Sequence, residues 1–276
     1  MTTTFIGGGN MATALIGGLL ARGVAAGDFR VVEPVAEART RLAARHPGVA
    51  LHAECTRDAV AGAALIVVAV KPQQMREAAH ALAAHVSRAP EPVVLSIAAG
   101  IRLADLSRWL GGYRRLVRAM PNTPALIGQG ISGLFAASDV DAPGRALATA
   151  VVEAAGEVVW VEDEAMLDAV TGVSGSGPAY VFYFIEALEK AALDLGFNAT
   201  EARRLAYATF AGSVALAQAS PDDPATLRAR VTSKGGTTER AIAALELGAV
   251  GATIVAAVKA AARRAEELGD ALGKDP

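Results

Sequence analysis

Phe5-Ile6-Gly7-Gly8-Gly9-Asn10-Met11-Ala12 is the stretch that decides the fold, because it joins a β-rich run to a helical one through glycines. It has the form G-x-G-x-x-A, directly after a predicted strand and at the start of a predicted helix. Gly7 permits the tight turn, Gly9 lets a pyrophosphate approach the backbone, and Ala12 lets the helix pack closely on the sheet. The helix N-terminus offers free N–H groups to the phosphates. The stretch therefore predicts a dinucleotide site.

Outward from this loop, short β-rich runs and helical stretches alternate over residues 1–162. Several of the β-rich runs are unbroken by polar residues, as a sheet covered on both faces requires. This alternation predicts a Rossmann-type, doubly wound parallel sheet. The predicted strands are residues 3–6, 29–32, 50–52, 65–70, 93–97, 115–118, 131–135 and 158–161.

The pattern changes after residue 162, where helical runs broken by Gly and Pro continue to the C-terminus without a convincing strand. The length of 276 residues also favours two domains. We therefore expect an α/β dinucleotide-binding domain over residues 1–162 and an all-helical domain over residues 163–276.

Composition narrows the function. Hydrophobic residues make up 53% and charged residues 20% of a chain with net charge −2, which argues against a nucleic-acid binder. Cys55 is the single cysteine, so an intrachain disulfide and a multi-cysteine zinc site are excluded, and we expect no metal. A reducing cytoplasm fits this cysteine usage. The most apolar helical run, residues 179–195, is interrupted by four charged residues, so we expect no membrane span.

Glu33 follows the second predicted strand, where Rossmann proteins contact the adenine ribose. A carboxylate there accepts hydrogen bonds from both ribose hydroxyls and repels a 2′-phosphate, which favours NAD; the alternative is a solvated surface carboxylate. The loops after two later strands, residues 69–72 and 96–100, should also border the cofactor. Lys71 in the first of them is either a phosphate partner or a surface lysine.

The reaction must use few reactive groups. All four histidines lie in the first domain outside the motif loops, and the helical domain has neither histidine nor cysteine. Reduction of a ketone needs a proton donor near the oxygen. A protonated C=N bond needs none, because its nitrogen arrives already cationic. A site of hydroxyls and backbone amides is therefore sufficient for an imine.

Two loops of the helical domain have that character. Residues 173–180, Val-Ser-Gly-Ser-Gly-Pro-Ala-Tyr, place Pro178 in a first helical turn, with Ser176 or Gly177 as its N-cap. Residues 231–238, Val-Thr-Ser-Lys-Gly-Gly-Thr-Thr, precede another helix, and their Gly-Gly pair should expose N–H groups to a carboxylate. Thr238 can offer a hydroxyl to a ring nitrogen. The alternative is that both are ordinary capped helix starts.

At these positions the sequence resembles the pyrroline-5-carboxylate reductase family. The resemblance covers nearly the whole chain, in residues 5–11, 69–72, 96–100, 120–124 (Met-Pro-Asn-Thr-Pro), 172–180 and 224–246. It implies a Rossmann domain followed by a helical dimerisation domain, a homodimer, and, as larger assembly, a decamer of dimers. It also implies hydride transfer from NADPH or NADH to the C=N carbon of 1-pyrroline-5-carboxylate, giving L-proline in the last step of proline biosynthesis.

The resemblance also assigns residues. Thr238 and Ser176 match the catalytic pocket, and the substrate site matches Ser233, Gly235, Gly236, Thr237 and Thr238. Cofactor contacts match Ile6, Gly7, Gly8, Gly9, Asn10, Met11, Thr56, Ala69, Val70, Lys71, Pro72, Ala98 and Ala99, with Met120 and Asn122 near the nicotinamide. Glu33 is a departure, because many relatives have Ser, Thr or Asn there and use NADPH. Lys234 also departs, standing where proline is usual.

Three alternative functions share part of this pattern. A 3-hydroxyisobutyrate or 6-phosphogluconate dehydrogenase type has a catalytic lysine after its glycine motif, and Val181 occupies that position here. A reductase of another cyclic imine, such as pyrroline-2-carboxylate, remains the alternative enzyme. A non-catalytic NAD(P)-sensing module would need an output domain, and the chain has none to spare.

Overall fold

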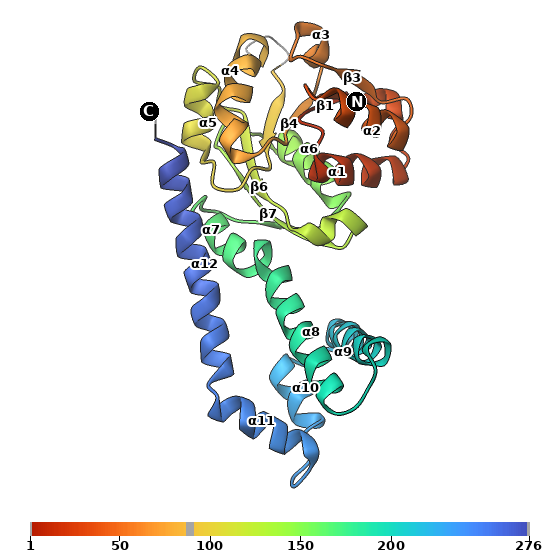
Figure 1. Ribbon diagram of the computed structural model, residues 1–276. Coiled ribbons are helices and arrows are strands. Elements are labelled where there is room, and N and C mark those ends of the chain that lie inside the picture. The colour runs from red at the N-terminus through yellow and green to blue at the C-terminus, as the bar shows by residue number, and fades with distance from the viewer. Residues whose placement is uncertain (1, 87–90, 275–276) are drawn as a thin grey trace. The chain divides into compact units, whose positions relative to one another are not determined.

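The computed structural model describes residues 2–86 and 91–274 and divides into two compact units (Figure 1). Unit 1 runs to Ser176 and also takes in the chain from Ala260 onward, whereas unit 2 is Gly177–Lys259. This division differs from the boundary after residue 162 expected from sequence. Residues 163–176 belong to unit 1 because their helix packs on the sheet, as described below.

An eight-stranded sheet forms the centre of unit 1, in the order β3-β2-β1-β4-β5-β6-β7-β8. All eight predicted strands are present, with ends that differ by at most two residues. They are β1 Thr3–Ile6, β2 Phe29–Val32, β3 Ala50–His52, β4 Leu65–Val68, β5 Val93–Ser96, β6 Leu116–Met120, β7 Gly130–Ala136 and β8 Gly156–Trp160.

One pairing departs from the parallel arrangement, because β7 runs antiparallel to β6. The connection between them, residues 121–129, holds only the 3₁₀ helix η3 (Thr123–Ile127). A parallel crossover needs about a dozen residues or more. The chain therefore returns beside β6 in the opposite direction, and the next strand, β8, pairs parallel with β7.

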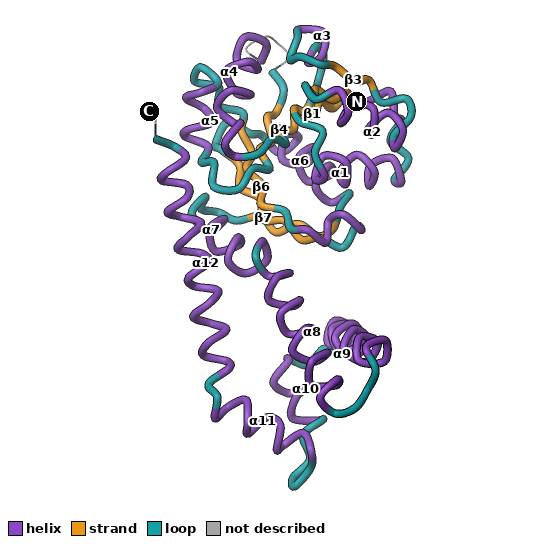
Figure 2. Tube along the Cα trace, in the orientation of Figure 1, coloured by secondary structure: helices purple, strands orange, loops and turns teal. Residues whose placement is uncertain are grey.

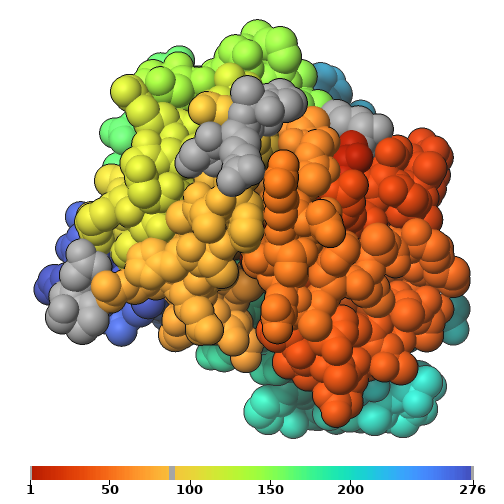
Figure 3. All heavy atoms as spheres, turned by 90° about the horizontal axis from the view of Figure 1, so that it is seen from above, coloured from red at the N-terminus to blue at the C-terminus, as the bar shows by residue number. Residues whose placement is uncertain are grey.

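Helices cover both faces of the sheet, as its apolar strands require. One core contains Phe5 and Val31 and is covered by α1 (Asn10–Ala21), α2 (Ala36–Arg45) and α6 (Ala142–Glu153). The other contains Ile6 and Val32 and is covered by α3 (Arg57–Val60), α4 (Met75–Val86) and α5 (Leu103–Trp109). Figure 3 looks onto unit 1 from above, where segments coloured orange and yellow, including α3 to α5, make up much of the visible surface.

The chain from Met166 to Asp194 is helical except for a bend at Ser176. It comprises α7 (Met166–Val170), a π-helical segment (Thr171–Gly175) and α8 (Gly177–Asp194). Ser176, between them, has φ −85° and ψ −17°, which is right-handed helical rather than extended. As predicted, α8 begins at Gly177 with Pro178 in its first turn, although Ser176 before it lacks the extended backbone typical of an N-cap.

The described residues of unit 2 form helices joined by loops and contain no strand, as Figure 2 shows by colour. It holds α8, α9 (Ala199–Ala219), α10 (Pro224–Arg230), α11 (Thr237–Leu247) and the first part of α12 (Val250–Leu272). Many of its large apolar side chains are exposed, among them Tyr183 and Leu247. No single helix in the described ranges is long and apolar enough to cross a membrane, although α11 and α12 pass that length and composition test when taken together across their 51° bend.

Candidate active site

The glycine loop has the geometry that its sequence predicted. Gly7 has φ +97°, and a Cβ at this position would lie 2.8 Å from the carbonyl oxygen of Ala69. Gly9 is exposed, and a Cβ at this position would meet no atom within 4 Å, so the backbone here is open to a ligand. Gly9 is also the N-cap of α1 and has no side chain with which to cap the helix. Asn10 and Met11 therefore begin a helix whose first amides receive no side-chain cap.

Glu33 turns its carboxylate toward this loop. Its Oε2 atom accepts the Gly8 N–H at 2.9 Å, and its Oε1 atom accepts the Val35 N–H at 3.0 Å. Arg39 donates to the carbonyl oxygen of Glu33 at 2.7 Å and so braces the turn after β2. The carboxylate is thus held next to the glycine loop, which distinguishes it from a freely solvated surface group. A negative charge at this point opposes a 2′-phosphate.

The other predicted cofactor residues lie beyond the carboxyl ends of neighbouring parallel strands. Ile6 ends β1, and its carbonyl oxygen accepts the Ala69 N–H at 2.8 Å. Thr56 follows β3 and caps α3, with its hydroxyl 3.4 Å from the Ala59 amide. Val70, Lys71 and Pro72 follow β4, and the Lys71 side chain is exposed. Ala98 and Ala99 follow β5. The glycine loop and these segments form one edge of the sheet, where open α/β sheets bind ligands.

Met120 and Asn122 lie at the end of β6 and contact the π-helical segment. A Cβ at Gly175 would lie 2.6 Å from the Cε atom of Met120. Asn122 is buried and donates from Nδ2 to the Ser174 carbonyl oxygen at 3.2 Å. Ser176 follows Gly175 directly in the chain and also belongs to unit 1. The sequence had put Ser176 in a separate domain.

The loop of residues 233–238 belongs to unit 2. Its two glycine amides are not free, because Gly235 N–H donates to Glu239 Oε2 at 2.7 Å and Gly236 N–H donates to the Ser233 carbonyl oxygen at 3.0 Å. The expectation that the Gly-Gly pair offers its amides to a carboxylate therefore needs correction. Gly236 is the N-cap of α11 but has no side chain to accept a hydrogen bond. The first-turn amides of Thr237 and Thr238 therefore receive no side-chain cap.

Two titratable groups of unit 1, His46 and Cys55, have pKa values shifted by burial. Burial and the neighbouring Arg45 guanidinium lower the pKa of His46, at the end of α2. His80 and His85 are on α4, and His52 ends β3. Burial raises the pKa of the Cys55 thiol, which keeps it protonated. Within residues 2–86 and 91–274, no group of three or more His, Cys, Asp or Glu side chains is arranged to hold a metal ion.

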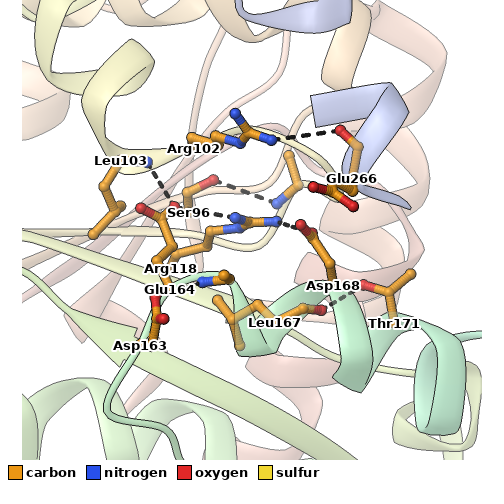
Figure 4. Close-up of polar contacts among 12 residues, drawn as sticks. Ser96, Arg102, Leu103, Arg118, Asp163, Glu164, Leu167, Asp168, Thr171 and Glu266 are labelled. Atoms are coloured by element: carbon orange, nitrogen blue, oxygen red, sulfur yellow. Dashed lines mark hydrogen bonds and ion pairs between the residues drawn. The ribbon is translucent and has the colours of Figure 1, made fainter. Parts of the chain in front are cut away.

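The sequence analysis missed a buried ionic cluster on the same strand as Met120. Arg118 is 2% exposed, and Figure 4 shows it between Glu164 and Asp168. The sequence does contain a signal for this cluster, because the arginine within the apolar run Leu-Val-Arg-Ala-Met cannot be buried without partners. A cavity of about 440 Å³ lies beside the cluster, lined by Arg102, Arg118, Glu164, Ala165, Asp168, Ala169, Ala262, Arg263 and Glu266. It includes none of the predicted cofactor or substrate residues.

Two protein-family models match separate parts of the chain. Residues 164–268 match the family model "Pyrroline-5-carboxylate reductase dimerisation", and residues 2–100 match "NADP oxidoreductase coenzyme F420-dependent". A pyrroline-5-carboxylate reductase from Pseudomonas aeruginosa is 45% identical over 98% of this chain and 97% of its own length.

Two solved structures extend the comparison. The pyrroline-5-carboxylate reductase from Coxiella burnetii is 37% identical with a TM-score of 0.91, over 97% of this chain and 98% of that one. The pyrroline carboxylate reductase from Plasmodium falciparum, with NADP bound, is 24% identical with a TM-score of 0.85, over 98% of each chain. Because its identity is only 24%, the similarity to the Plasmodium falciparum structure supports the fold alone.

Proposed function

This chain belongs to the pyrroline-5-carboxylate reductase family, and on that premise we infer that it reduces 1-pyrroline-5-carboxylate to L-proline, the last step of proline biosynthesis, with NAD(P)H. The observation that carries this inference is the 45% identity over nearly the full length of both chains. The glycine loop at the carboxyl edge of the sheet fits the cofactor, because Gly7 makes the turn and Gly9 leaves space for the phosphates.

We propose that the bound dinucleotide is held by the residues at the strand ends and supplies the hydride. Ile6 to Met11 would hold the pyrophosphate, with Thr56, Ala69, Val70, Lys71, Pro72, Ala98 and Ala99 around it. Met120 and Asn122 would flank the nicotinamide ring. Support comes from the position of all these residues at one edge of unit 1, where Gly175 and Ser174 contact Met120 and Asn122.

We propose that the substrate is held by hydroxyls and amides. The first-turn amides of Thr237 and Thr238, at the positive end of α11, suit the carboxylate. Ser233, Gly235 and Gly236 would shape that loop, since a Cβ at Gly236 would lie 2.5 Å from Ser233 Oγ. The Thr238 hydroxyl would accept the N–H of the iminium, and the Ser176 hydroxyl is the second proposed catalytic group. The iminium nitrogen is already protonated, so no protein acid has to deliver a proton to it when the carbon accepts the hydride.

Glu33 bears on the choice of coenzyme. Its carboxylate, fixed by Gly8 and Val35, is suited to accept hydrogen bonds from ribose hydroxyls and unsuited to a 2′-phosphate. We therefore propose that the enzyme uses NADH efficiently beside NADPH, unlike a strictly NADPH-dependent relative.

We propose that residues 1–162 act as the dinucleotide-binding domain and residues 163–276 as the helical dimerisation domain, although residues 163–176 pack within unit 1. The dimerisation model matched at residues 164–268 supports this boundary. The exposed apolar side chains of unit 2 support a homodimer, because a dimer interface would cover them. A decamer of dimers is the proposed larger assembly, which light scattering would detect. A cytoplasmic location, and no nucleic-acid or membrane partner, complete the proposal.

The test is steady-state oxidation of NADH and of NADPH by purified enzyme, with 1-pyrroline-5-carboxylate and pyrroline-2-carboxylate in parallel. We expect rapid turnover of the first substrate with both coenzymes, and proline as the product. Turnover of pyrroline-2-carboxylate alone would replace the substrate assignment with that of another cyclic-imine reductase. Coenzyme binding without any turnover would favour a sensing module.

A further inference from the structure

Arg118 carries a charge in the middle of a buried strand. It lies on β6 between Val117 and Ala119, which are both in the apolar core, and is itself 2% exposed. Its Nη1 atom is 3.0 Å from Glu164 Oε1, and its Nη2 atom is 3.3 Å from Asp168 Oδ1. A buried guanidinium is stable only when its donors are matched in this way. The planar fork thus joins two carboxylates in one fixed geometry (Figure 4).

The two carboxylates connect Arg118 to the segments on either side of the strand. Glu164 lies just before α7, and its Oε1 atom also accepts the Leu103 N–H at 2.8 Å. Leu103 begins α5, directly after the loop that contains Ala98 and Ala99. Asp168 lies within α7, which continues into the π-helical segment. One guanidinium therefore links β6, α7 and the loop between β5 and α5.

The segments linked in this way carry the proposed nicotinamide and substrate groups of unit 1. Met120 is two residues from Arg118 on the same strand, so both side chains lie on one face of the sheet. The π-helical segment that follows Asp168 contacts Met120 through Gly175 and Asn122 through Ser174. The position of α7 thus decides where these contacts fall.

Steric contact holds α7 against the neighbouring strand as well. A Cβ at Gly133 of β7 would lie 2.8 Å from a Val170 methyl and 3.1 Å from a Leu167 methyl. The helix therefore has close backbone contact with β7 and an ionic contact with β6. A charged cluster is not needed for stability alone, because well-packed apolar residues often serve as well in its place.

We propose that Arg118 is a positioning residue for hydride transfer: through Glu164 and Asp168 it holds α7 and the π-helical segment in register with Met120 and Asn122. It contacts neither coenzyme nor substrate in this role. The adenine end of the site, at the glycine loop and Glu33, belongs to β1 and β2 and does not depend on the cluster. The inference rests on the proposed function of the same site.

The test uses two variants of the full-length enzyme that disturb α7 by different means. Asp168→Asn removes one charge with little change of shape, and Gly133→Ala forces the helix away from β7. We expect kcat with 1-pyrroline-5-carboxylate, per coenzyme-binding site, to fall about tenfold or more, the change that corresponds to a 1.4 kcal/mol higher barrier. The Kd for NADPH should change less than about twofold, since its adenine half is untouched.

Asp139→Asn is the matched control. It removes the acid of an exposed ion pair with Arg114, which lies just before the same strand, and should leave kcat and Kd unchanged. Arg118→Lys keeps the charge but cannot bridge both carboxylates with one fork, so its kcat should lie between those of the wild type and Asp168→Asn.

Amide hydrogen exchange of residues 166–176 in the NADPH complex provides a readout that does not depend on the substrate. We expect exchange in this segment to accelerate about tenfold in Asp168→Asn and not in Asp139→Asn. An unchanged kcat per site together with unchanged exchange in Asp168→Asn and Gly133→Ala would overturn the proposal. If the wild-type enzyme fails to reduce 1-pyrroline-5-carboxylate but the variants show this exchange pattern, the substrate assignment is contradicted and the positioning role of Arg118 is supported.

Discussion

The side-chain amide of Asn122 donates to the carbonyl oxygen of Ser174 at 3.2 Å, across the junction of a strand end and a π-helical segment. In an α-helix this carbonyl would accept the N–H of residue 178, but that residue is Pro178 and has none. The Oδ1 atom of Asn122 accepts the Ile131 N–H at 3.0 Å. One buried amide thus ties the end of β6, the start of β7 and the helix that follows α7.

Replacement of Asn122 by Asp removes the donor and keeps the acceptor. The Ser174 carbonyl would then face a carboxylate, and we expect the free energy of unfolding to fall by about 1–3 kcal/mol. The midpoint of urea unfolding measures this. Thr123→Ala, at the exposed neighbouring position, serves as the control and should unfold as the wild type does. An Asn122→Asp variant of full stability would mean that another donor replaces the amide.

Glu33→Ser should shift coenzyme preference toward NADPH. The substitution removes the negative charge that opposes a 2′-phosphate while leaving the glycine loop in place. We expect the ratio of kcat/KM for NADPH to that for NADH to rise about tenfold or more, equivalent to roughly 1.4 kcal/mol. Steady-state kinetics with both coenzymes gives the ratio directly. The same ratio in both proteins would remove Glu33 from the ribose site.

Thr238→Ala should impair the reaction without harming coenzyme binding. Loss of a hydrogen bond to a charged iminium costs about 1.5–3 kcal/mol, so kcat/KM for the imine should fall about tenfold or more. Thr238→Ser, which keeps the hydroxyl, should recover most of the activity. Full activity in Thr238→Ala would show that the hydroxyl is dispensable.

Two adjacent glycines of α1 should respond in opposite directions to alanine. A Cβ at Gly18 would lie 2.0 Å from the Ala154 carbonyl oxygen, whereas a Cβ at Gly17 would meet only His46 Cε1 at 3.5 Å. We expect Gly18→Ala to destabilise by about 1–3 kcal/mol through overpacking. Gly17→Ala should instead stabilise by about 0.5–1 kcal/mol, because alanine favours the helix. Thermal unfolding of the pair checks both, and equal shifts would contradict the packing of α1.

Much of unit 1 was predictable because its glycines and apolar runs are compatible with few local structures. A strand followed by Gly7 and Gly9 permits few alternatives to a dinucleotide loop, and the apolar runs mark strands covered on both faces. The antiparallel return of β7 was missed because strand direction follows from the connection length rather than from the strand's own residues.

The helical part was harder to predict. Gly-Ser-Gly-Pro around Ser176 is typical of a helix start, and α8 does begin at Gly177, but the π-helical segment directly before it was not predicted. Gly235 and Gly236 were expected to expose their amides, and Glu239 and Ser233 accept them instead. Both outcomes depend on individual hydrogen bonds that composition does not specify. Arg118 alone gave a readable signal, as a charge within a buried strand.

The central claim is that an iminium can be reduced between a nicotinamide and a pocket of amides and hydroxyls, without a protein acid. A crystal structure of the enzyme with NADP⁺ and L-proline tests it most directly. We expect C4 of the nicotinamide beside Met120 and Asn122, the proline carboxylate on the amides of Thr237 and Thr238, and the reacting carbons about 3–3.5 Å apart. Proline bound away from both Thr238 and the nicotinamide ring would contradict the account.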